Sequence, residues 1–338
     1  MGKRIGFLTF GHYQSVPGST VRTAQDALLQ TIELAVAAEE VGAHGAFVRV
    51  HHFARQLASP LPLLAAIAAR TSHIEIGTAV IDMRYANPLG MAEDAAAADL
   101  ISGGRLQLGL SRGSPETALR GYESFGYTPA DGEDDADLAR RHTRKFREAI
   151  AGATVAEANA RMTGVSGRLA IQPQSPGLPE RIWWGSGTRA TAEWTGQQGM
   201  NLMSSTLLTE DTGVPFDELQ AEQIARFHDA WAQAGWAREP RVSVSRSILP
   251  IIDDETRHYF GLRAQADAQD QVGMLDGALS RFGRSYIGEP DHIAAELAQD
   301  AAVAAADTVL VTVPNQLGVD FNARILESIV RDVLPVLD

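Results

Sequence analysis

The stretch FVRVHHFARQLASP, residues 47–60, has the layout of one β/α unit. Its first four residues extend an apolar run that begins at Gly45 and is typical of a buried strand. A polar loop follows the paired histidines His51 and His52, and Pro60 then opens an alanine-rich segment, as proline commonly does at the first position of a helix. The stretch therefore predicts a strand, a loop and a helix in that order.

The same alternation recurs along the 338 residues. The predicted strands are Arg4–Phe10, Gly45–Val50, His73–Val80, Arg105–Ser111, Arg181–Gly185, Met200–Ser205, Arg241–Ile251 and Asp307–Pro314. The predicted helices are Ala24–Val41, Pro60–Arg70, Pro88–Ile101, Leu138–Ala151, Ala190–Gln198, Phe216–Ala234, Asp291–Ala304 and Phe321–Val336. This pattern indicates an α/β fold, a single (β/α)8 TIM barrel spanning residues 1–338. An open doubly wound sheet also alternates, but no G-x-G-x-x-G follows the first strand.

Two segments exceed a minimal barrel. Residues 168–180, RLAIQPQSPGLPE, predict an extended or hairpin insertion before the fifth strand. Residues 254–289 form a long polar insertion after the seventh strand, which we expect to be helical in part. An insertion at the carboxyl mouth of a barrel often forms a lid over the site. A surface excursion without that role fits the sequence equally well.

Composition excludes several classes of function. The formal net charge of −13 repels phosphate backbones, so we expect no nucleic-acid partner. The chain has no cysteine, which excludes disulfides, thiolate chemistry and zinc–sulfur sites. No apolar stretch reaches membrane-spanning length and the N-terminus lacks a signal-peptide layout, so we expect a cytoplasmic protein with no membrane partner.

The histidine pair lies where the second strand ends, and the carboxyl ends of barrel strands build the active site. Adjacent strand residues point to opposite faces, so one imidazole faces the mouth and the other faces away. Whichever imidazole faces the mouth can exchange a proton near neutral pH, and the other is expected to be structural. Because two such imidazoles do not converge, no metal site is predicted.

A second candidate site lies in WWGSGTRATAEW, residues 183–194. Its glycines allow close approach of backbone N–H groups, and Ser186, Thr188 and Thr191 place hydroxyls at the start of the next helix. This chemistry suits a phosphate at a helix N-terminus, and Arg112 at the end of the fourth strand can add a charge-assisted contact. A Gly/Ser turn with an ordinary N-cap is the alternative. The spacing G-x-S-x-G is absent because Trp184 precedes Ser186 by two residues, so a hydrolase triad is not predicted.

Several blocks of the chain, in order and over nearly its whole length, resemble the bacterial luciferase-like flavin monooxygenase family. The most specific are HHF (51–53), GRLQLGLSRG (104–113) and IGEPDHI (287–293). The resemblance implies a (β/α)8 barrel that binds a flavin at its carboxyl mouth, with His51 as a catalytic acid/base and no role for His52. It also implies a non-proline cis peptide beneath the flavin ring at Ala79–Val80. The cofactor-binding residues expected on these grounds are Thr78, Ala79, Val80, Arg112, Ser114, Ser186, Gly187, Thr188 and Thr191. Acidic residues of the luciferase branch are replaced here by Val50 and Gly187, so their flavin contacts are not carried over.

The function that the resemblance implies is a monooxygenase. Reduced FMN and O2 would form a C4a-peroxyflavin that oxidises a small organic substrate, with reduced FMN supplied by a separate NAD(P)H:flavin reductase. One alternative is an F420-dependent hydride-transfer oxidoreductase, whose anionic cofactor tail would meet Arg55, Arg84, Arg112 or Arg189. A non-catalytic flavin-binding protein is another, and the residues alone allow a barrel enzyme acting on a phosphorylated metabolite. The resemblance also implies a homodimer formed through the helices at 60–70 and 88–101.

Overall fold

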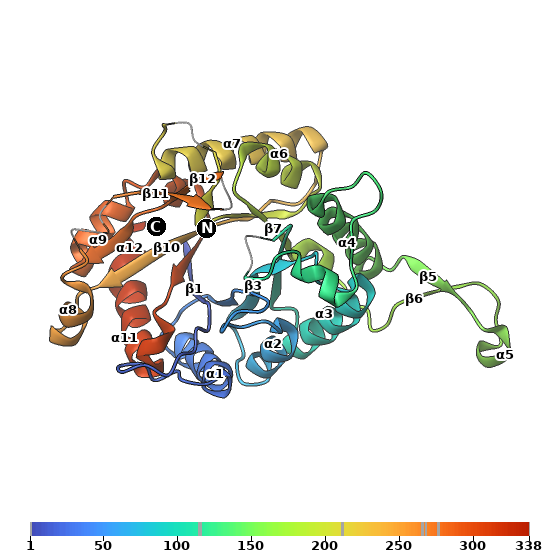
Figure 1. Cartoon of the computed structure of the whole chain (residues 1–338), viewed down its shortest axis with the longest axis horizontal. Helices are drawn as coiled ribbons and strands as arrows, with labels where there is room; N and C mark the ends of the chain where they lie inside the picture. The colour runs from blue at the N-terminus through green and yellow to red at the C-terminus, as the bar shows by residue number, and fades with distance from the viewer. Residues whose placement is uncertain are drawn as a thin grey trace.

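Eight parallel strands close into a barrel in the computed structural model, which describes residues 2–113, 117–210, 213–264, 267, 269–275 and 278–337 (Figure 1). The barrel strands are β1 (Arg4–Thr9), β2 (Gly45–Val48), β3 (Glu75–Asp82), β4 (Leu106–Ser111), β7 (Ile182–Ser186), β8 (Asn201–Ser204), β10 (Val242–Pro250) and β14 (Thr308–Thr312). Strand β1 pairs with β2 and β14, and β10 pairs with β8 and β14, so the ring is closed. The predicted (β/α)8 barrel is confirmed, with every predicted strand boundary within two residues of the observed one.

Helices surround the barrel between successive strands (Figure 1). They are α1 (Ala24–Glu40), α2 (Pro60–Ala68), α3 (Pro88–Ser102), α4 (Asp135–Ile150), α6 (Arg189–Gln197), α7 (Phe216–Ala234), α9 (Pro290–Leu297), α10 (Ala301–Ala305), α11 (Val319–Ser328) and α12 (Leu334–Leu337). Short 3-10 helices cover Gly121–Phe125, Leu178–Arg181 and Asn315–Leu317, and a π-helical turn covers Ile329–Val333. The single helix predicted at 291–304 is wrong. It is divided because Asp300 caps a new helix, accepting hydrogen bonds from the backbone N–H groups of Ala302 and Val303.

The barrel interior is packed at its centre and closed at its amino end. Six buried residues fill the centre: Leu8, Phe47, Ala79, Trp183, Met203 and Leu310. Near the strand starts, Trp183 donates its indole N–H to Gln107 at 2.9 Å, and Arg241 pairs with Glu75 at 2.8 Å. These contacts occupy one end of the barrel, which leaves the carboxyl end for a binding site.

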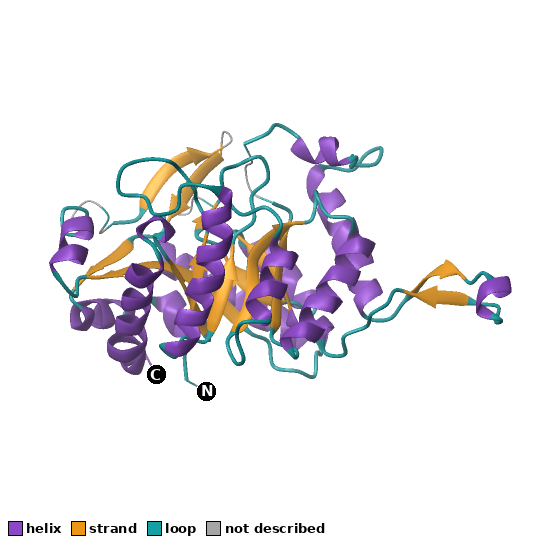
Figure 2. Cartoon of the chain, turned by 90° about the horizontal axis from the view of Figure 1, so that it is seen from below, coloured by secondary structure: helices purple, strands orange, loops and turns teal. Residues whose placement is uncertain are grey.

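A hairpin arm projects from the body between α4 and β7 (Figures 1 and 2). It consists of β5 (Thr154–Glu157), α5 (Ala160–Thr163) and β6 (Arg168–Ala170). The insertion predicted at 168–180 therefore begins too late, since the first strand of the hairpin lies before it. Most arm residues are exposed, so β5 is defined by its pairing with β6 and carries no buried apolar pattern that sequence can reveal.

The second insertion contains α8 (Asp254–Phe260), β11 (Gln271–Leu275), β12 (Ala278–Phe282) and β13 (Ser285–Gly288). It is partly helical, as predicted, but most of its regular structure is strand. Strand β12 pairs antiparallel with β11 and with β9 (Leu207–Leu208), while β13 joins β10 in parallel. Because β9 directly follows β8, this small sheet lies on the side of the barrel's carboxyl ends (Figure 2).

Candidate active site

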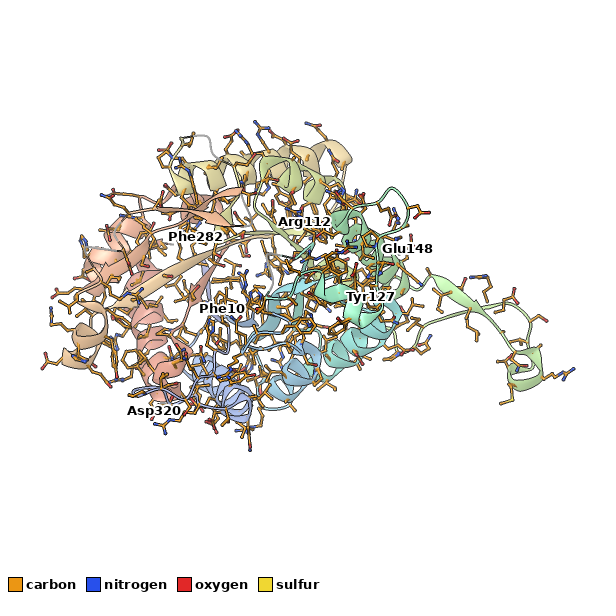
Figure 3. All side chains as sticks on the ribbon, viewed as in Figure 1. Phe10, Arg112, Tyr127, Glu148, Phe282 and Asp320 are labelled. Carbon is orange, nitrogen blue, oxygen red and sulfur yellow. The ribbon has the colours of Figure 1, made fainter. Side chains whose placement is uncertain are left out.

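A cavity opens at the carboxyl ends of the barrel strands. Figure 3 shows Phe10 and Arg112 on different sides of this opening. The lining residues are Leu8, Arg49, Val50, Ala79, Val80, Asp82, Ser111, Arg112, Gly113, Trp184, Gly185, Ser186, Gly187, Thr188, Thr191, Met203, Ser204, Ser205, Thr206, Leu207, Thr209, Ser245 and Leu310. The cavity thus brings together seven of the predicted site residues: Ala79, Val80, Arg112, Ser186, Gly187, Thr188 and Thr191.

The corner between β7 and α6 is built around two threonine hydroxyls. Thr188 is the N-cap of α6, and its hydroxyl accepts a hydrogen bond from the Thr191 backbone N–H at 3.2 Å. The two threonine hydroxyl oxygens lie 2.9 Å apart, and the Ser186 hydroxyl donates to the Thr188 carbonyl at 2.9 Å. An ordinary N-cap is therefore present, and the same hydroxyls lie beside the positive end of the helix, where an anion is stabilised.

Gly187 keeps this corner open. A Cβ atom at this position would lie 3.0 Å from the Leu207 carbonyl oxygen, which belongs to the backbone of β9. A side chain there would crowd the strand that follows β8. The glycine therefore allows β9 to approach the start of α6, and its backbone borders the cavity.

Arg112 lines the same cavity and directly follows β4, the strand that pairs with β7 ahead of that helix. Its side chain is exposed, and no ion pair with it is recorded within the described parts of the chain. Ser114, the next predicted cofactor-binding residue, lies outside the described residues. Arg55 is exposed on the β2–α2 loop and does not line the cavity.

Asp82 is the one acidic side chain that lines the described cavity, and Arg84 neutralises it. The Arg84 guanidinium binds the Asp82 carboxylate at 2.7–3.0 Å and reaches Asp135 of α4 at 2.5 Å. Burial alone would lower the pKa of Arg84, but hydrogen bonds and charge from Asp82 and Asp135 raise it. Arg84 therefore anchors α4 to the end of β3 and is not available to a ligand tail.

The cavity floor is formed by β3. The peptide bond between Ala79 and Val80 is cis, which is the geometry the resemblance implied at this place. Thr78, the residue before this bond, is fully buried and does not line the cavity. Its hydroxyl bonds to the neighbouring strand, donating to the Gly109 carbonyl at 2.8 Å and accepting from the Gly109 N–H at 3.1 Å. The β3–β4 register shifts at this point, between Thr78 and Ile81.

The wall formed by the ends of β1 and β2 carries a stack of rings with an arginine. The Arg49 Nε–H donates to His51 Nε2 at 2.9 Å, and the guanidinium carbon lies 5.1 Å from the centre of the Phe10 ring. Phe10 stacks on His51 and on His12, with centroids 6.3 Å and 5.4 Å away. Burial, and then the charge of His51, lower the pKa of His12. His51 itself does not line the cavity, and it is linked to it through the hydrogen bond from Arg49.

His52 points away from this wall. Its ring stacks on Tyr85 at 4.1 Å and meets Phe125 edge-on at 5.2 Å. It lines a separate hollow between α2 and α3. The two adjacent imidazoles therefore have different surroundings, one aromatic and outward and one beside the arginine at the mouth.

Sequence reasoning missed Phe10, His12, Arg49 and Asp82. For Arg49 a signal existed: strand periodicity places residue 49 on the same face as Phe47, which is in the barrel interior, and as His51. The other three lie at strand ends without a distinguishing local pattern.

Within the described residues, no group of three or more His, Asp or Glu side chains is placed to hold a metal ion. The same residues contain no helix both long and apolar enough to cross a bilayer.

The closed barrel identifies the chain as a TIM-barrel protein. Its cavity lies at the carboxyl ends of the strands, which is where TIM-barrel enzymes carry their active sites. Residues 4–308 match the luciferase-like monooxygenase family. The chain belongs to that family.

Curated relatives match over shorter segments. The oxygenase component of the flavin-dependent trigonelline monooxygenase of Acinetobacter baylyi is 33% identical over 110 residues, which are 32% of this chain and 30% of the relative. The 4-hydroxyprotoasukamycin monooxygenase of Streptomyces nodosus subsp. asukaensis is 33% identical over 107 residues, 31% of this chain and 28% of the relative. The matched segments thus span about three tenths of each of these relatives.

Solved structures share the fold over the whole chain. Monooxygenase RslO1 from Streptomyces bottropensis superposes with a TM-score of 0.73 at 20% identity, covering 98% of this chain and 99% of that one. The oxygenating constituent of 3,6-diketocamphane monooxygenase of Pseudomonas putida, solved with FMN, gives 0.69 at 16% identity and 99% coverage of both chains. The F420-dependent tetrahydromethanopterin reductase of Methanopyrus kandleri gives 0.66 at 15% identity and full coverage of both. At these identities the likeness establishes the fold alone.

Proposed function

We propose that this chain is the oxygenase component of an FMN-dependent monooxygenase that oxidises a small organic substrate. When bound, reduced FMN supplies the two electrons with which one oxygen atom of O2 enters the substrate and the other leaves as water. The observation that carries the proposal is one cavity that combines the hydroxyl-lined start of α6, the cation of Arg112 and the Ala79–Val80 floor.

The cavity fits the parts of FMN separately. The Thr188 and Thr191 hydroxyls with Arg112 suit a doubly charged phosphate. Ala79 and Gly185 put no large side chain of their own into the cavity, and a Cβ added to Gly185 would meet Val80 at 3.3 Å. We assign the phosphate to the β4/β7 side and the flavin ring to the β3 floor. Thr78 and Ser186 support these positions through backbone hydrogen bonds, and Ser114 remains a candidate contact.

His51 is the proposed acid/base. Because Nε2 accepts a hydrogen bond from Arg49, the proton of the neutral ring is on Nδ1 in this arrangement. The imidazole can move a proton at either nitrogen if the Arg49 side chain shifts. His52 has no proposed role in the reaction.

An F420-dependent enzyme is the competing function, supported by solved relatives of the same fold. Its anionic tail needs cations at the mouth. Arg189 is already paired with Glu210 at 3.1 Å and with Glu222 at 3.3 Å, and Arg84 is held by Asp82. Of the four arginines considered for the tail, Arg112 alone lines the described cavity, which favours FMN.

The test begins with FMN and F420 titrations of the purified protein. The FMN complex is then reduced without air, mixed with isotopically labelled O2 and a panel of organic compounds, and the products are analysed by mass spectrometry. A product that gains one labelled oxygen supports the monooxygenase. Tight F420 binding with O2-independent oxidation of reduced F420 would indicate an F420-dependent oxidoreductase instead of a monooxygenase. FMN binding without any product above the free-flavin control would indicate a flavin-binding protein with no turnover.

The partners form part of the same proposal. A separate NAD(P)H:flavin reductase is proposed to deliver reduced FMN, as for an oxygenase component such as the matched trigonelline monooxygenase, and the lack of a dinucleotide fingerprint after the first strand is consistent with that division. Activity that depends on an added reductase, and not on NAD(P)H alone, would support this. We place the protein in the cytoplasm, which fractionation of the source cells tests.

A homodimer through α2 and α3 is proposed as well. Near the end of α3, Leu100 and Ile101 are 49% and 56% exposed, and α2 packs against α3. Light scattering should give twice the mass of one chain. Replacing Leu100 and Ile101 together by Glu should shift the mass to that of one chain, and a single-chain mass for the unaltered protein contradicts the assembly.

The insertion at 254–289 is proposed to act as a lid. Strand β12 pairs with β9, and Leu207 of β9 lines the cavity, so movement of the insertion would reach the cavity wall. FMN should slow proteolysis within 254–289. Equal cleavage rates with and without FMN would indicate a fixed surface excursion.

A further inference from the structure

The side of the cavity formed by the ends of β8 and β10 carries hydroxyl groups and no charged side chain. Its hydroxyl-bearing lining residues are Ser204, Ser205, Thr206, Thr209 and Ser245. The charged side chains that line the described cavity lie at or just after the ends of β2, β3 and β4, and they are Arg49, Asp82 and Arg112. The cavity therefore has a charged half and an uncharged half.

Ser245 of β10 faces the barrel interior. It is paired in register with Leu310 of β14, which packs at the barrel centre. Side chains paired in register on neighbouring parallel strands share one face of the sheet. The neighbours of Ser245 along β10 point outward, because Val244 belongs to the outer core and the Arg246 guanidinium is buried against Asp300.

Ser205 faces the interior beside it. This residue comes directly after β8, and its backbone N–H still donates to the Ser186 carbonyl of β7 at 2.8 Å, so the strand pairing continues to this position. Ser205 follows the interior residue Met203 by two positions. The β8–β10 register pairs Ser204 with Val244, which brings Ser205 level with Ser245 on the adjacent strand.

Both hydroxyls keep an O–H group for a ligand. The Ser205 oxygen accepts a hydrogen bond from the Leu207 backbone N–H at 3.2 Å, which uses a lone pair and leaves the proton to be donated. The Ser245 backbone carbonyl accepts from Arg246 at 3.0 Å, whereas its hydroxyl makes no hydrogen bond to another of the described residues. The cavity thus presents two adjacent hydroxyl donors.

A buried network behind this side of the cavity holds it in place. Gln220 of α7 donates to the Ser204 hydroxyl and to the Ser205 carbonyl, both at 2.8 Å. The Gln220 side-chain oxygen accepts from Arg246 at 2.8 Å, and this fixes the orientation of the amide because an arginine can only donate. Asp300 binds the same guanidinium at 2.7 and 2.9 Å. Because buried polar networks of this kind hold their members in one arrangement, Ser205 is positioned before a ligand arrives.

The two serines lie across the barrel from the floor assigned to the flavin ring. In the closed ring of strands, β10 is reached from β3 through β4, β7 and β8 in one direction and through β2, β1 and β14 in the other. The two strands are therefore diametrically opposite. A flavin ring resting on Ala79–Val80 would leave the space between it and Ser245 to another molecule.

We infer that Ser205 and Ser245 are specificity-determining residues that donate hydrogen bonds to the carbonyl oxygen of an uncharged substrate. The inference rests on the proposed function in calling that ligand the substrate. A carbonyl oxygen has two lone pairs, and neighbouring strands lie about 4.8 Å apart, so one oxygen can accept from both hydroxyls. An anionic group would gain more beside Arg112, whereas two hydroxyls satisfy a neutral oxygen without taking a charge out of water.

Acetophenone and α-methylstyrene are the probes, because they differ only in the exchange of the carbonyl oxygen for a methylene group. Calorimetry measures the binding of each probe with and without FMN. The ratio of the two affinities is compared between variants, so that the different hydration of the free probes cancels. Ser205→Ala and Ser245→Ala should each weaken acetophenone binding by about 2–10-fold, as expected for the loss of one hydrogen bond. The affinities for α-methylstyrene and for FMN should stay nearly unchanged, and Ser205→Thr should retain most of the acetophenone affinity.

The matched control is Ser247→Ala, which removes a hydroxyl from the same face of β10 two residues further on, where it does not line the cavity. It should leave the ratio of the two affinities intact. Circular dichroism and melting curves establish that each variant is folded, and Ser245→Ala serves if Ser205→Ala is not.

Equal weakening of both probes in the two alanine variants overturns the inference, as does acetophenone binding that survives both substitutions. Absence of acetophenone binding to the unaltered protein at millimolar concentration overturns it too. A loss of FMN affinity with an unchanged ratio of probe affinities overturns it and assigns the hydroxyls to the flavin. Failure of the unaltered protein to bind FMN sinks the proposed function, while the calorimetry without FMN still decides the role of Ser205 and Ser245.

Discussion

The two walls of the cavity are built in different ways. The β4/β7 wall consists of a helix start with its capping hydroxyls and one arginine, so most of its groups come from a single short segment, Ser186–Thr191. The β1/β2 wall consists of side chains that meet from separate strands, with Phe10 and His12 beside Arg49 and His51. The first wall suits a constant ligand part such as a phosphate, and the second suits a part that differs between enzymes. The contrast predicts that changes on one wall affect cofactor affinity and changes on the other affect chemistry.

The largest effect is expected from His51→Ala. If the β1/β2 wall carries the chemistry, oxidation of the reduced-FMN complex in stopped-flow mixing with O2 should slow by ~10²–10⁴, the usual contribution of a positioned acid/base. FMN affinity should change little, because the proposed phosphate contacts lie on the other wall.

His52→Ala is the control for this prediction. Its ring packs on Tyr85 and Phe125, so the variant should lower the melting temperature. It should leave the oxidation rate of the reduced-FMN complex nearly unchanged. If His51→Ala reacts at the unaltered rate, His51 is a structural part of the wall and the contrast between the walls fails.

Arg112→Ala should weaken FMN binding by ~10–100-fold, as expected for loss of a charge-assisted contact. Riboflavin, which has no phosphate, should bind the variant and the unaltered protein alike. Fluorescence quenching of each flavin measures both affinities. A similar loss for both flavins would remove the phosphate from the β4/β7 wall.

Thr188→Val tests the helix start with a smaller change. The variant loses the hydroxyl that caps α6, which should lower the free energy of unfolding by ~1 kcal/mol and weaken FMN several-fold. Thr188→Ser keeps the hydroxyl and should restore most of both. Chemical denaturation and FMN titration measure the two effects. A Thr188→Val protein that binds FMN normally would show that the hydroxyl serves the helix alone.

The smallest expected effect is the pH dependence of the free energy of unfolding. Of the two walls only the β1/β2 wall should contribute to it near neutral pH, because the segments of the β4/β7 wall, Leu106–Gly113 and Ile182–Thr191, contain no histidine. Burial and the charge of His51 lower the pKa of His12, so the folded protein disfavours its protonated form. The free energy of unfolding should therefore decline as the pH falls below the unfolded value of about 6.5 toward the lower folded value. The lowered pKa values of His142 and His228, also caused mainly by burial, contribute in the same direction.

His12→Gln isolates the contribution of this wall. Melting curves between about pH 7.5 and about pH 5.5 should show a shallower decline than for the unaltered protein. The His12 ring stacks on Phe10 and feels the charge of His51. The Asn315 amide donates to the His12 backbone carbonyl at 2.8 Å, a bond that the variant keeps. An identical pH dependence in the variant would mean that His12 does not titrate differently on folding.

Particular elements show how far local patterns reach. The Gly45–Val50 strand, the proline-led α2 and the Thr188 cap all follow from residues within a few positions of one another, and each was predicted. By contrast, the arm strand β5 and the two-residue strand β9 exist through pairing with β6 and β12, and neither has a buried face long enough to mark it.

The candidate site divides in the same manner. The hydroxyls at the start of α6 follow from helix capping, whereas His51 and His52 lie beyond the end of β2 at Val48, in a loop that gives them different surroundings. The neutralisation of Asp82 by Arg84 is also local, yet the link from Arg84 to Asp135 joins positions 51 residues apart. Arg189 forms ion pairs with Glu210 and Glu222, which lie 21 and 33 residues away in the chain. These pairs make Arg189 unavailable to bind a cofactor tail.

The sequence by itself determined the alternation of strands and helices, the carboxyl ends at which a site can form and the hydroxyl-lined start of α6. These features depend on hydrogen bonds and side-chain periods that span a few residues, so they are written in short segments. Only the tertiary structure decided which charges remain at the mouth and that Phe10 meets Arg49 and His51. Those contacts exist because parallel strands far apart in the chain become neighbours when the barrel closes, and register then sets which side chains face each other.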